Sequence, residues 1–298
     1  SRKIMSQTDS KVIVITGCSS GIGLETAVAC AKNDMKVFAC VRNPYKANEL
    51  KNRIETENLS KIEIIEMDVS NDISIKTGIQ KINSSTDHID ILFNNAGRMV
   101  LGSLEDLSDK ELTGQLNTDL QGVIILTKNI IPIMRKNNSG LIINMSSVAG
   151  RIGFPLSSAY CISKFGIEGL SQVLRRELQT KNINVCLIEA GVVDTKFFVN
   201  TPDAMSSKDQ NGKFVGPYSE DTEIMRTVLN RIMKKIEDKE LDASKPSDVG
   251  EKVLEIIREN GKEFRYIIGH DAEAMIAALE SSNDDQSKMD VAIENIMK

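Results

Sequence analysis

The sequence predicts an α/β fold: a doubly wound parallel sheet of about seven strands, with helices on both faces and a substrate lid inserted after the sixth strand. Three observations predict it. Short apolar runs rich in β-branched residues alternate with helix patterns along the chain, an order typical of right-handed β-α-β crossovers. The first run leads directly into a glycine-rich turn. The alternation lapses once, late in the chain, over residues 197–241.

The first unit consists of a strand, a glycine turn and a helix. Residues 12–15 (V-I-V-I) form a run of the buried parallel-strand type. Residues 16–23 (T-G-C-S-S-G-I-G) follow, and residues 22–32 have a helix pattern. In this context glycines let backbone amides approach a pyrophosphate at a helix amino terminus. The same spacing also suits an ordinary strand-to-helix turn, so the loop alone leaves both interpretations open.

The second strand, residues 36–41, ends where an acid that binds an adenosine ribose would be expected. This sequence has no acid there, and Arg42 follows the strand directly. An arginine at this place can pair with a 2′-phosphate, which favours NADP(H) over NAD(H) as the cofactor. The alternative is an ordinary arginine that faces solvent.

Two more strands end in residues suited to the same ligand. Residues 62–67 form the third strand, after which Asp68 caps the helix predicted at 70–82, contacts adenine, or does both. Residues 89–93 form the fourth strand, followed by N-N-A-G at 94–97. Small residues there would let a cofactor lie against the backbone, although Asn and Gly also favour simple turns.

The fifth strand and the helix after it hold the candidate catalytic residues. Ser147 follows the strand at 141–145, so its hydroxyl would lie at the carboxyl edge of the sheet, where ligands bind. Tyr160 and Lys164 are four residues apart in the helix predicted at 155–179, and therefore share one face. A neighbouring cation favours a phenolate, which makes Tyr160 a usable proton donor or acceptor.

The remaining chain completes one domain. A sixth strand at 183–188 precedes E-A-G-V-V-D-T, a late insertion is the natural lid over a substrate, and a helix from Pro246 precedes a last strand at 264–269. The predicted division is a disordered lead (1–10), a single domain (11–282) with its substrate lid (197–245), and a C-terminal helical tail (283–298).

Composition excludes several classes of function. The net charge of −5 argues against a nucleic-acid-binding surface, and no apolar run approaches the ~18 residues of a membrane span. Two histidines far apart, His88 and His270, leave little from which to build a metal site or a Ser-His-Asp triad. Five cysteines without a C-x-x-C pair fit buried packing in a reducing, cytoplasmic compartment. Redox sensitivity of Cys18 or Cys161 is the alternative.

Together these motifs resemble the common subclass of the short-chain dehydrogenase/reductase family over residues 11–272. That resemblance implies a Rossmann-like fold and hydride transfer between a nicotinamide and a carbonyl or alcohol. Residues 159–170 and 265–272 look most like members that act on lipophilic molecules, such as 17β-hydroxysteroid and retinol dehydrogenases and acyl-dihydroxyacetone reductases. The motifs are T-G-x-x-x-G-I-G at 16–23, Asp68, N-N-A-G at 94–97, Ser147, Tyr160-x-x-x-Lys164, and Glu189-x-Gly191 with Thr195.

The resemblance implies a role for each matching residue. Tyr160 would be the general acid/base, Ser147 would hold the substrate oxygen, and Lys164 would bind the nicotinamide ribose and lower the pKa of Tyr160. It also implies a small-molecule carbonyl or alcohol substrate and a homodimer or homotetramer. The implied cofactor contacts are Gly17, Ser19, Ser20, Gly21, Ile22, Gly23, Arg42, Asp68, Val69, Asn95, Ala96, Gly97, Tyr160, Lys164, Val193 and Thr195.

The sequence departs from the family pattern at two positions. Ala190 stands where a proline is usual, which implies a small loss of loop rigidity. Asp119 stands at the place of an active-site asparagine, and Asn117, two residues away, should face elsewhere. An aspartate can accept the same hydrogen bond, but its charge would offset part of the effect of Lys164 on Tyr160. We therefore expect activity with a raised pH optimum.

A rival interpretation is a protein that binds the cofactor but has lost catalysis and serves as a sensor or assembly subunit. The substitution at Asp119 is its support in the sequence. The intact Ser147, Tyr160 and Lys164 argue against it.

Overall fold

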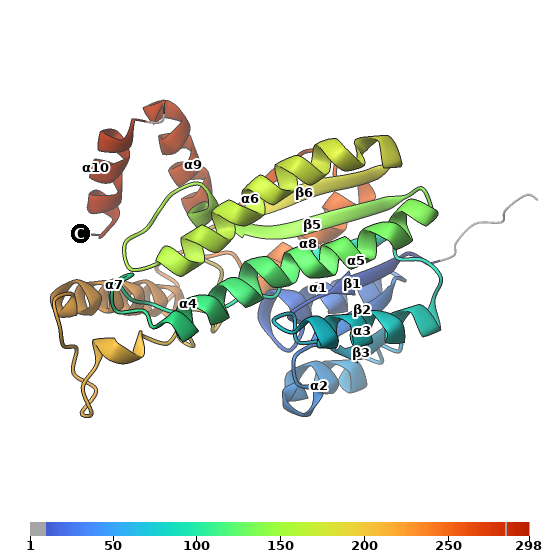
Figure 1. The fold of residues 1–298 in the computed structure, drawn as a ribbon, viewed down its shortest axis with the longest axis horizontal. Coiled ribbons are helices and arrows are strands. Elements are labelled where there is room, and N and C mark those ends of the chain that lie inside the picture. Colours follow the sequence, from blue (N-terminus) through green and yellow to red (C-terminus); the bar gives the residue numbers. More distant parts are fainter. Residues whose placement is uncertain (1–9, 284, 298) are drawn as a thin grey trace, which may run out of the picture.

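One parallel sheet forms the centre of the molecule. The structure is a computed structural model and describes residues 10–283 and 285–297. Within these residues, seven parallel strands have the order β3-β2-β1-β4-β5-β6-β7, which confirms the predicted α/β doubly wound sheet (Figure 1). The strands are β1 (Val12–Ile15), β2 (Lys36–Val41), β3 (Ile62–Glu66), β4 (Ile91–Asn94), β5 (Gly140–Ser147), β6 (Ile183–Ala190) and β7 (Arg265–Ile268).

Helices cover both faces of the sheet because successive strand residues point to opposite sides. Ile13 and Ile15 pack in a core with helices α1, α2 and α8. Val12 and Val14 pack in a second core with α3, α5 and α6. The helices are α1 (Gly21–Lys32), α2 (Asn48–Thr56), α3 (Asp72–Ser85), α4 (Asp109–Leu116), α5 (Gly122–Lys136), α6 (Ser158–Leu178), α7 (Ser219–Glu237), α8 (Pro246–Arg258), α9 (His270–Ser282) and α10 (Gln286–Met297).

Residues 109–135 have a continuous helix pattern in the sequence, but the structure interrupts this stretch. Helices α4 and α5 are joined by a π-helical turn, Asn117–Gln121, a feature frequent at functional sites. Gly122 lies so close to another segment that a Cβ there would be 2.3 Å from the Val69 carbonyl oxygen. The helix therefore passes against the backbone after β3, and its path is set by tertiary packing.

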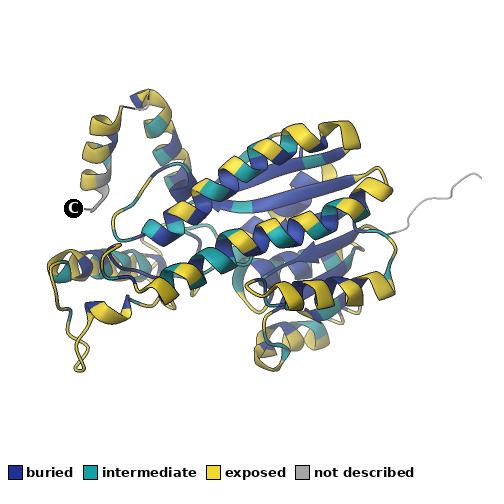
Figure 2. Cartoon of the chain, in the orientation of Figure 1, coloured by how far each residue is buried: buried dark blue, intermediate teal, exposed yellow. Residues whose placement is uncertain are grey.

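The segments that differ most from a simple alternation lie at the carboxyl edge of the sheet. Helix α7 and the pair α9 and α10 stand at this end (Figure 1). The sheet strands between the helix layers are buried, whereas the outer faces of the helices are exposed (Figure 2). Apart from Ser10, the predicted disordered lead lies outside the described residues. Among the helices described, none combines the length and apolarity that crossing a membrane requires.

Candidate active site

A crevice is expected beside β1, where the strand order reverses, because β1 lies between β2 and β4. The loops that follow β1 and β4 are joined there by hydrogen bonds. The Thr16 hydroxyl accepts from the backbone N–H groups of Asn95 (3.0 Å) and Ala96 (2.9 Å). The Asn95 amide donates to the Thr16 carbonyl oxygen at 3.1 Å. The glycine loop and the N-N-A-G turn therefore form one wall.

The glycines of this loop are required by close approach. Gly17 has a φ of +70°, and a Cβ on it would lie 2.8 Å from the Ala96 Cα atom. A Cβ on Gly23 would lie 2.2 Å from the Gly17 carbonyl oxygen. Ser20, the N-cap of α1, makes no side-chain capping bond, so the first N–H groups of α1 lack a side-chain acceptor. Such a cradle fits an anionic group such as a pyrophosphate.

The predicted adenosine-side residues lie around the ends of β2 and β3. The Cys18 N–H donates to the Cys40 carbonyl oxygen at 3.0 Å, so the glycine loop lies beside the end of β2, which exposed Arg42 follows. The Asp68 carboxylate accepts from the Ser70 N–H at 2.9 Å. Asn71, not Asp68, caps α3. The capping alternative for Asp68 is therefore wrong, because the helix begins two residues later than predicted.

The structure brings the three candidate catalytic residues together. Ser147 is the last residue of β5, and its hydroxyl accepts from the Ala149 N–H at 3.1 Å. Tyr160 lies in the first turn of α6, and Lys164 follows one turn later. The Lys164 Nζ atom is 5.6 Å from the Tyr160 ring centroid and donates to the Met145 carbonyl oxygen at 2.9 Å. The ammonium is therefore fixed against both the helix and the strand.

Burial dominates the electrostatics of these residues. It raises the pKa of Tyr160, the Asp119 carboxylate raises it further, and hydrogen bonding with Ser147 lowers it. Burial also lowers the pKa of Lys164, whereas Asp119 and Glu168 raise it. The pKa of Tyr160 thus moves opposite to the direction that the family resemblance implies, because desolvation of the phenolate outweighs the favourable contacts.

Asp119 lies in the π-helical turn and links the β4 loop to Lys164. It is only 1% exposed, and its two oxygens accept from the Arg98 N–H (2.9 Å) and the Gln115 amide (2.8 Å). Burial raises the pKa of Asp119 to about 7, against the opposing effects of Lys164 and these donors. Within the described residues, the second Gln115 side-chain atom, Oε1, is buried without a hydrogen-bond partner.

A buried ion-pair network lies close to the site and could not be predicted from the sequence. Fully buried Glu189 pairs with Arg151 at 3.2 Å and with Arg265 at 3.1 Å. Arg265 also pairs with Glu168 at 3.1 Å, and Glu168 accepts from the Ser146 hydroxyl at 2.7 Å. The network ties the carboxyl ends of β5 and β6 to α6. Glu189 in the E-A-G stretch was the available signal, but its partners come from distant parts of the chain.

The segment after β6 is held by backbone hydrogen bonds and lies near the glycine loop. The Asp194 N–H donates to the Ser244 carbonyl oxygen at 2.8 Å, and the Thr195 N–H donates to that of Val193 at 2.7 Å. A Cβ on Gly21 would lie 3.5 Å from the Thr195 methyl carbon. The predicted residue Thr195 therefore lies against the glycine loop, and Val193 precedes it by two residues.

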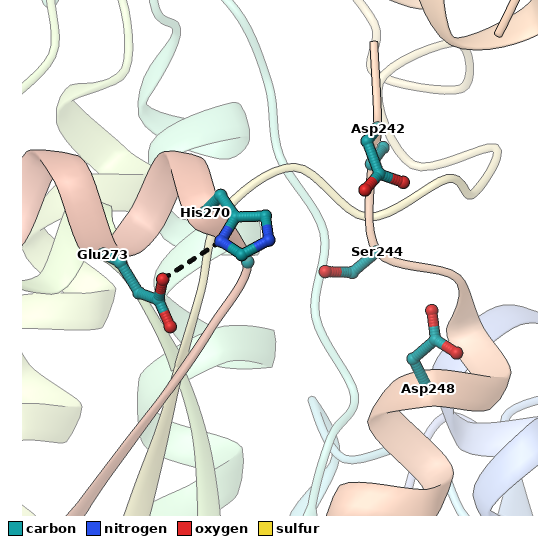
Figure 3. A pocket seen from close by; sticks show the side chains of 7 residues that line it. Asp242, Ser244, Asp248, His270 and Glu273 are labelled. Carbon is teal, nitrogen blue, oxygen red and sulfur yellow. Dashed lines mark hydrogen bonds and ion pairs between the residues drawn. The ribbon is translucent and has the colours of Figure 1, made fainter.

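A separate pocket lies outside this arrangement (Figure 3). Its lining shares no residue with the Ser147, Tyr160 and Lys164 cluster. In the described part of the chain, no group of three or more His, Cys, Asp or Glu side chains is arranged to hold a metal ion. The lining residues are Asp242, Ala243, Ser244, Asp248, Gly269, His270 and Glu273.

The five cysteines are free and buried, as the packing interpretation expects. Burial is the main cause that raises the pKa of each thiol, including those of Cys18 and Cys161. A raised thiol pKa opposes the thiolate form that redox chemistry needs.

Comparison with known proteins identifies the relatives of the chain. The family model for short chain dehydrogenases matches residues 11–206. A 3-ketodihydrosphingosine reductase from Bacteroides thetaiotaomicron is 31% identical over 271 residues, covering 91% of this chain and 92% of that protein. Two solved structures share the fold at 21% identity. A short-chain dehydrogenase/reductase from Burkholderia phymatum in complex with NAD has a TM-score of 0.78, covering 95% of this chain and 97% of its own. A metagenomic short-chain oxidoreductase in complex with NADP has a TM-score of 0.65, covering 87% and 96%.

Proposed function

Because the chain belongs to the short-chain dehydrogenase family, we propose that it is an NADP(H)-dependent oxidoreductase acting on a lipophilic carbonyl or secondary alcohol, with Tyr160 as general acid/base. The observation that carries this proposal is the meeting of Ser147, Tyr160 and Lys164 at the carboxyl end of β5, beside the crevice. Near one another, a phenol, a hydroxyl and an ammonium can supply the proton, the hydrogen bond and the positive charge that carbonyl reduction uses.

The residues of the crevice fit a dinucleotide, since the start of α1 beside the glycine loop has no side-chain cap and its backbone N–H groups can donate to a pyrophosphate. Bound there, a nicotinamide supplies or accepts the hydride at the substrate carbon. Tyr160 donates its phenolic proton to the carbonyl oxygen during reduction and takes it back during oxidation. The Ser147 hydroxyl holds that oxygen, and Lys164 places positive charge beside the phenol.

Arg42 is the residue on which the choice of NADP(H) depends. Arg42→Ala is expected to weaken NADPH binding by about tenfold or more, because a charge-assisted bond to the 2′-phosphate is lost. NADH binding should change little. Titration of both cofactors measures the ratio, with Arg135→Ala, an exposed arginine at the end of α5, as the matched control. Equal NADPH affinity in Arg42→Ala and the unaltered protein would favour NAD(H) instead.

The lipophilic substrate is supported by the surroundings of Tyr160. The Phe197 ring lies 5.9 Å from the Tyr160 ring, and the Phe198 ring lies 5.5 Å from that of Phe197. These rings pack with Met99, Leu101 and Met225, and Met225 belongs to α7. We therefore propose residues 197–245 as the lid. The likeness to a protein named 3-ketodihydrosphingosine reductase points to a long-chain keto lipid as a candidate.

The proposal is tested by following nicotinamide absorbance with NADPH or NADH and a panel of carbonyls: 3-ketodihydrosphingosine, steroids and retinoids. Turnover with NADPH and one substrate class is the expected result. Tight NADPH binding without turnover on any carbonyl would favour the rival, a silenced cofactor-binding protein. The raised pKa of Tyr160 and the presence of Asp119 are the observations on its side.

A homodimer or homotetramer is proposed on the outer faces of α5 and α6. Four large apolar side chains on these helices are 39–49% exposed: Ile124, Ile162, Phe165 and Val173. The three on α6 recur three and eight residues apart, close to one helical face. Phe165→Asp is expected to lower the molecular mass measured by analytical ultracentrifugation to that of a monomer. The control Ile73→Asp changes a residue on α3 that is 76% exposed and should leave the mass unchanged. A monomer in the unaltered protein would contradict the proposal.

A further inference from the structure

We propose that Asp271, at the start of α9, is a positioning residue for the nicotinamide end of the cofactor site. Its carboxylate fixes the backbone of the segment that follows β6. The inference rests on the proposed function and on the family resemblance, which implies that Thr195 and the backbone near Val193 meet the carboxamide of the nicotinamide.

The contact between Asp271 and this segment is direct. The Val192 N–H donates to Asp271 Oδ2 at 2.7 Å. A Cβ on Gly191 would lie 2.2 Å from both oxygens of the same carboxylate. Only a glycine at position 191 therefore lets the carboxylate lie flat against this peptide.

Asp271 completes a set of bonds that use the amides around Val193. The Gly191 N–H donates to the Ile268 carbonyl oxygen at 3.1 Å, and the Asp194 N–H donates to that of Ser244 at 2.8 Å. With Val192 bonded to Asp271, the Val193 N–H is flanked by occupied amides and has no acceptor among the described residues. A buried N–H group is rarely left without a partner. This amide is thus presented to a ligand.

The carboxylate is itself held firmly. Asp271 lies in the first turn of α9, where the helix dipole favours negative charge. The next residue, Ala272, is fully buried and packs with Ile276 and Val148, the residue after Ser147. Of the two anchors of the segment, Ser244 lines the pocket of Figure 3, and Asp271 follows the lining residue His270 in the chain. The bond to Asp271 supplies the restraint that Ala190, in place of a proline, does not.

The test separates the two halves of the cofactor. NADPH and 2′,5′-ADP, which lacks the nicotinamide half, are titrated into the unaltered protein, Asp271→Ala, Asp271→Asn and the control Glu273→Ala. Glu273 is exposed and lies in the same helical turn, and the change Glu273→Ala removes the same charge as Asp271→Ala. Asp271→Ala is expected to bind NADPH about tenfold more weakly and 2′,5′-ADP unchanged. Asp271→Asn keeps an acceptor oxygen and should restore most of the affinity.

Gly191→Ala alone keeps the test decisive if Asp271→Ala folds poorly, and if both variants fold the two changes form a double-mutant cycle. The new methyl group displaces the carboxylate, so Gly191→Ala alone should weaken NADPH binding by a similar factor. The double variant should be no worse than either single one, because the two changes remove the same contact.

NADPH affinity unchanged in Asp271→Ala, equal losses for both probes, or additive effects in the cycle would each overturn the role of Asp271. Failure of the unaltered protein to bind NADPH or NADH would instead overturn the proposed function. The two failures appear in different proteins and are therefore distinguishable.

Discussion

Tyr160→Phe is expected to lower kcat by about a thousandfold while NADPH binding is retained. General acid–base catalysis contributes about 10²–10⁴-fold, and removal of the hydroxyl takes away the proposed proton donor. The ring remains, so its packing against Phe197 at 5.9 Å and its contact with Lys164 at 5.6 Å are preserved. The loss should therefore fall on the chemical step.

The measurement compares kcat with the dissociation constant of NADPH in the same preparations. Tyr266→Phe is a matched control, since the Tyr266 hydroxyl accepts from the Glu263 N–H and donates to Glu259 and contacts none of the candidate catalytic residues. That variant should keep its turnover. Full activity in Tyr160→Phe would remove the basis of the assigned mechanism.

The convergence of Ser147 and Tyr160 could be predicted from the sequence for a physical reason. Residues 12–15 and 141–145 read as buried parallel strands, and the carboxyl ends of such strands meet at one edge of a sheet. The helix after β5 must then return over the same edge, which places its first turn beside Ser147. The predicted strand ends were within a few residues because apolar periodicity fixes the centre of an element better than its boundaries.

The interruption at Asn117–Gln121 could not be predicted, because residues 109–135 carry a continuous helix pattern. The turn is associated with a contact between Gly122 and the Val69 carbonyl oxygen, which is far away in the sequence. The direction in which the pKa of Tyr160 is shifted could not be predicted for a similar reason. Spacing placed the Lys164 cation beside the phenol, but burial depends on how the whole chain packs.

The same limit applies to the polar partners of the site. Arg265 and Asp271 reach the ends of β5 and β6 from the far end of the chain. No local sequence pattern predicts contacts between residues so far apart in the chain. The proposed ligand contacts belong to short sequence motifs and can be predicted from them. The residues that hold those motifs in place are identified only from the folded structure.

Asp119→Asn is expected to change both stability and the pH–rate profile. The pKa of Asp119 is raised from 3.8 to about 7 in the folded protein, so the folded state binds more protons than the unfolded state between these values. The contribution of Asp119 to the free energy of unfolding is therefore fully present below about pH 4. It is lost as the pH rises through 7, and the loss amounts to up to about 4 kcal/mol. Asparagine does not titrate. The variant should gain in Tm relative to the unaltered protein as the pH rises, with the gain levelling off above about pH 8.

The same charge acts on Tyr160. Above neutral pH the ionised Asp119 raises the pKa of Tyr160, so its removal should move the titrating limb of kcat/KM to lower pH by about one unit. The new amide keeps one acceptor oxygen, and Gln115 can turn its unpartnered Oε1 toward the amide hydrogens. Asp72→Asn, at an exposed position in α3, is the control for both measurements. A higher Tm at alkaline pH with an unmoved limb would mean that Asp119 acts only on folding. A moved limb would mean that the carboxylate in the π-helical turn sets the pH at which the proposed acid/base works.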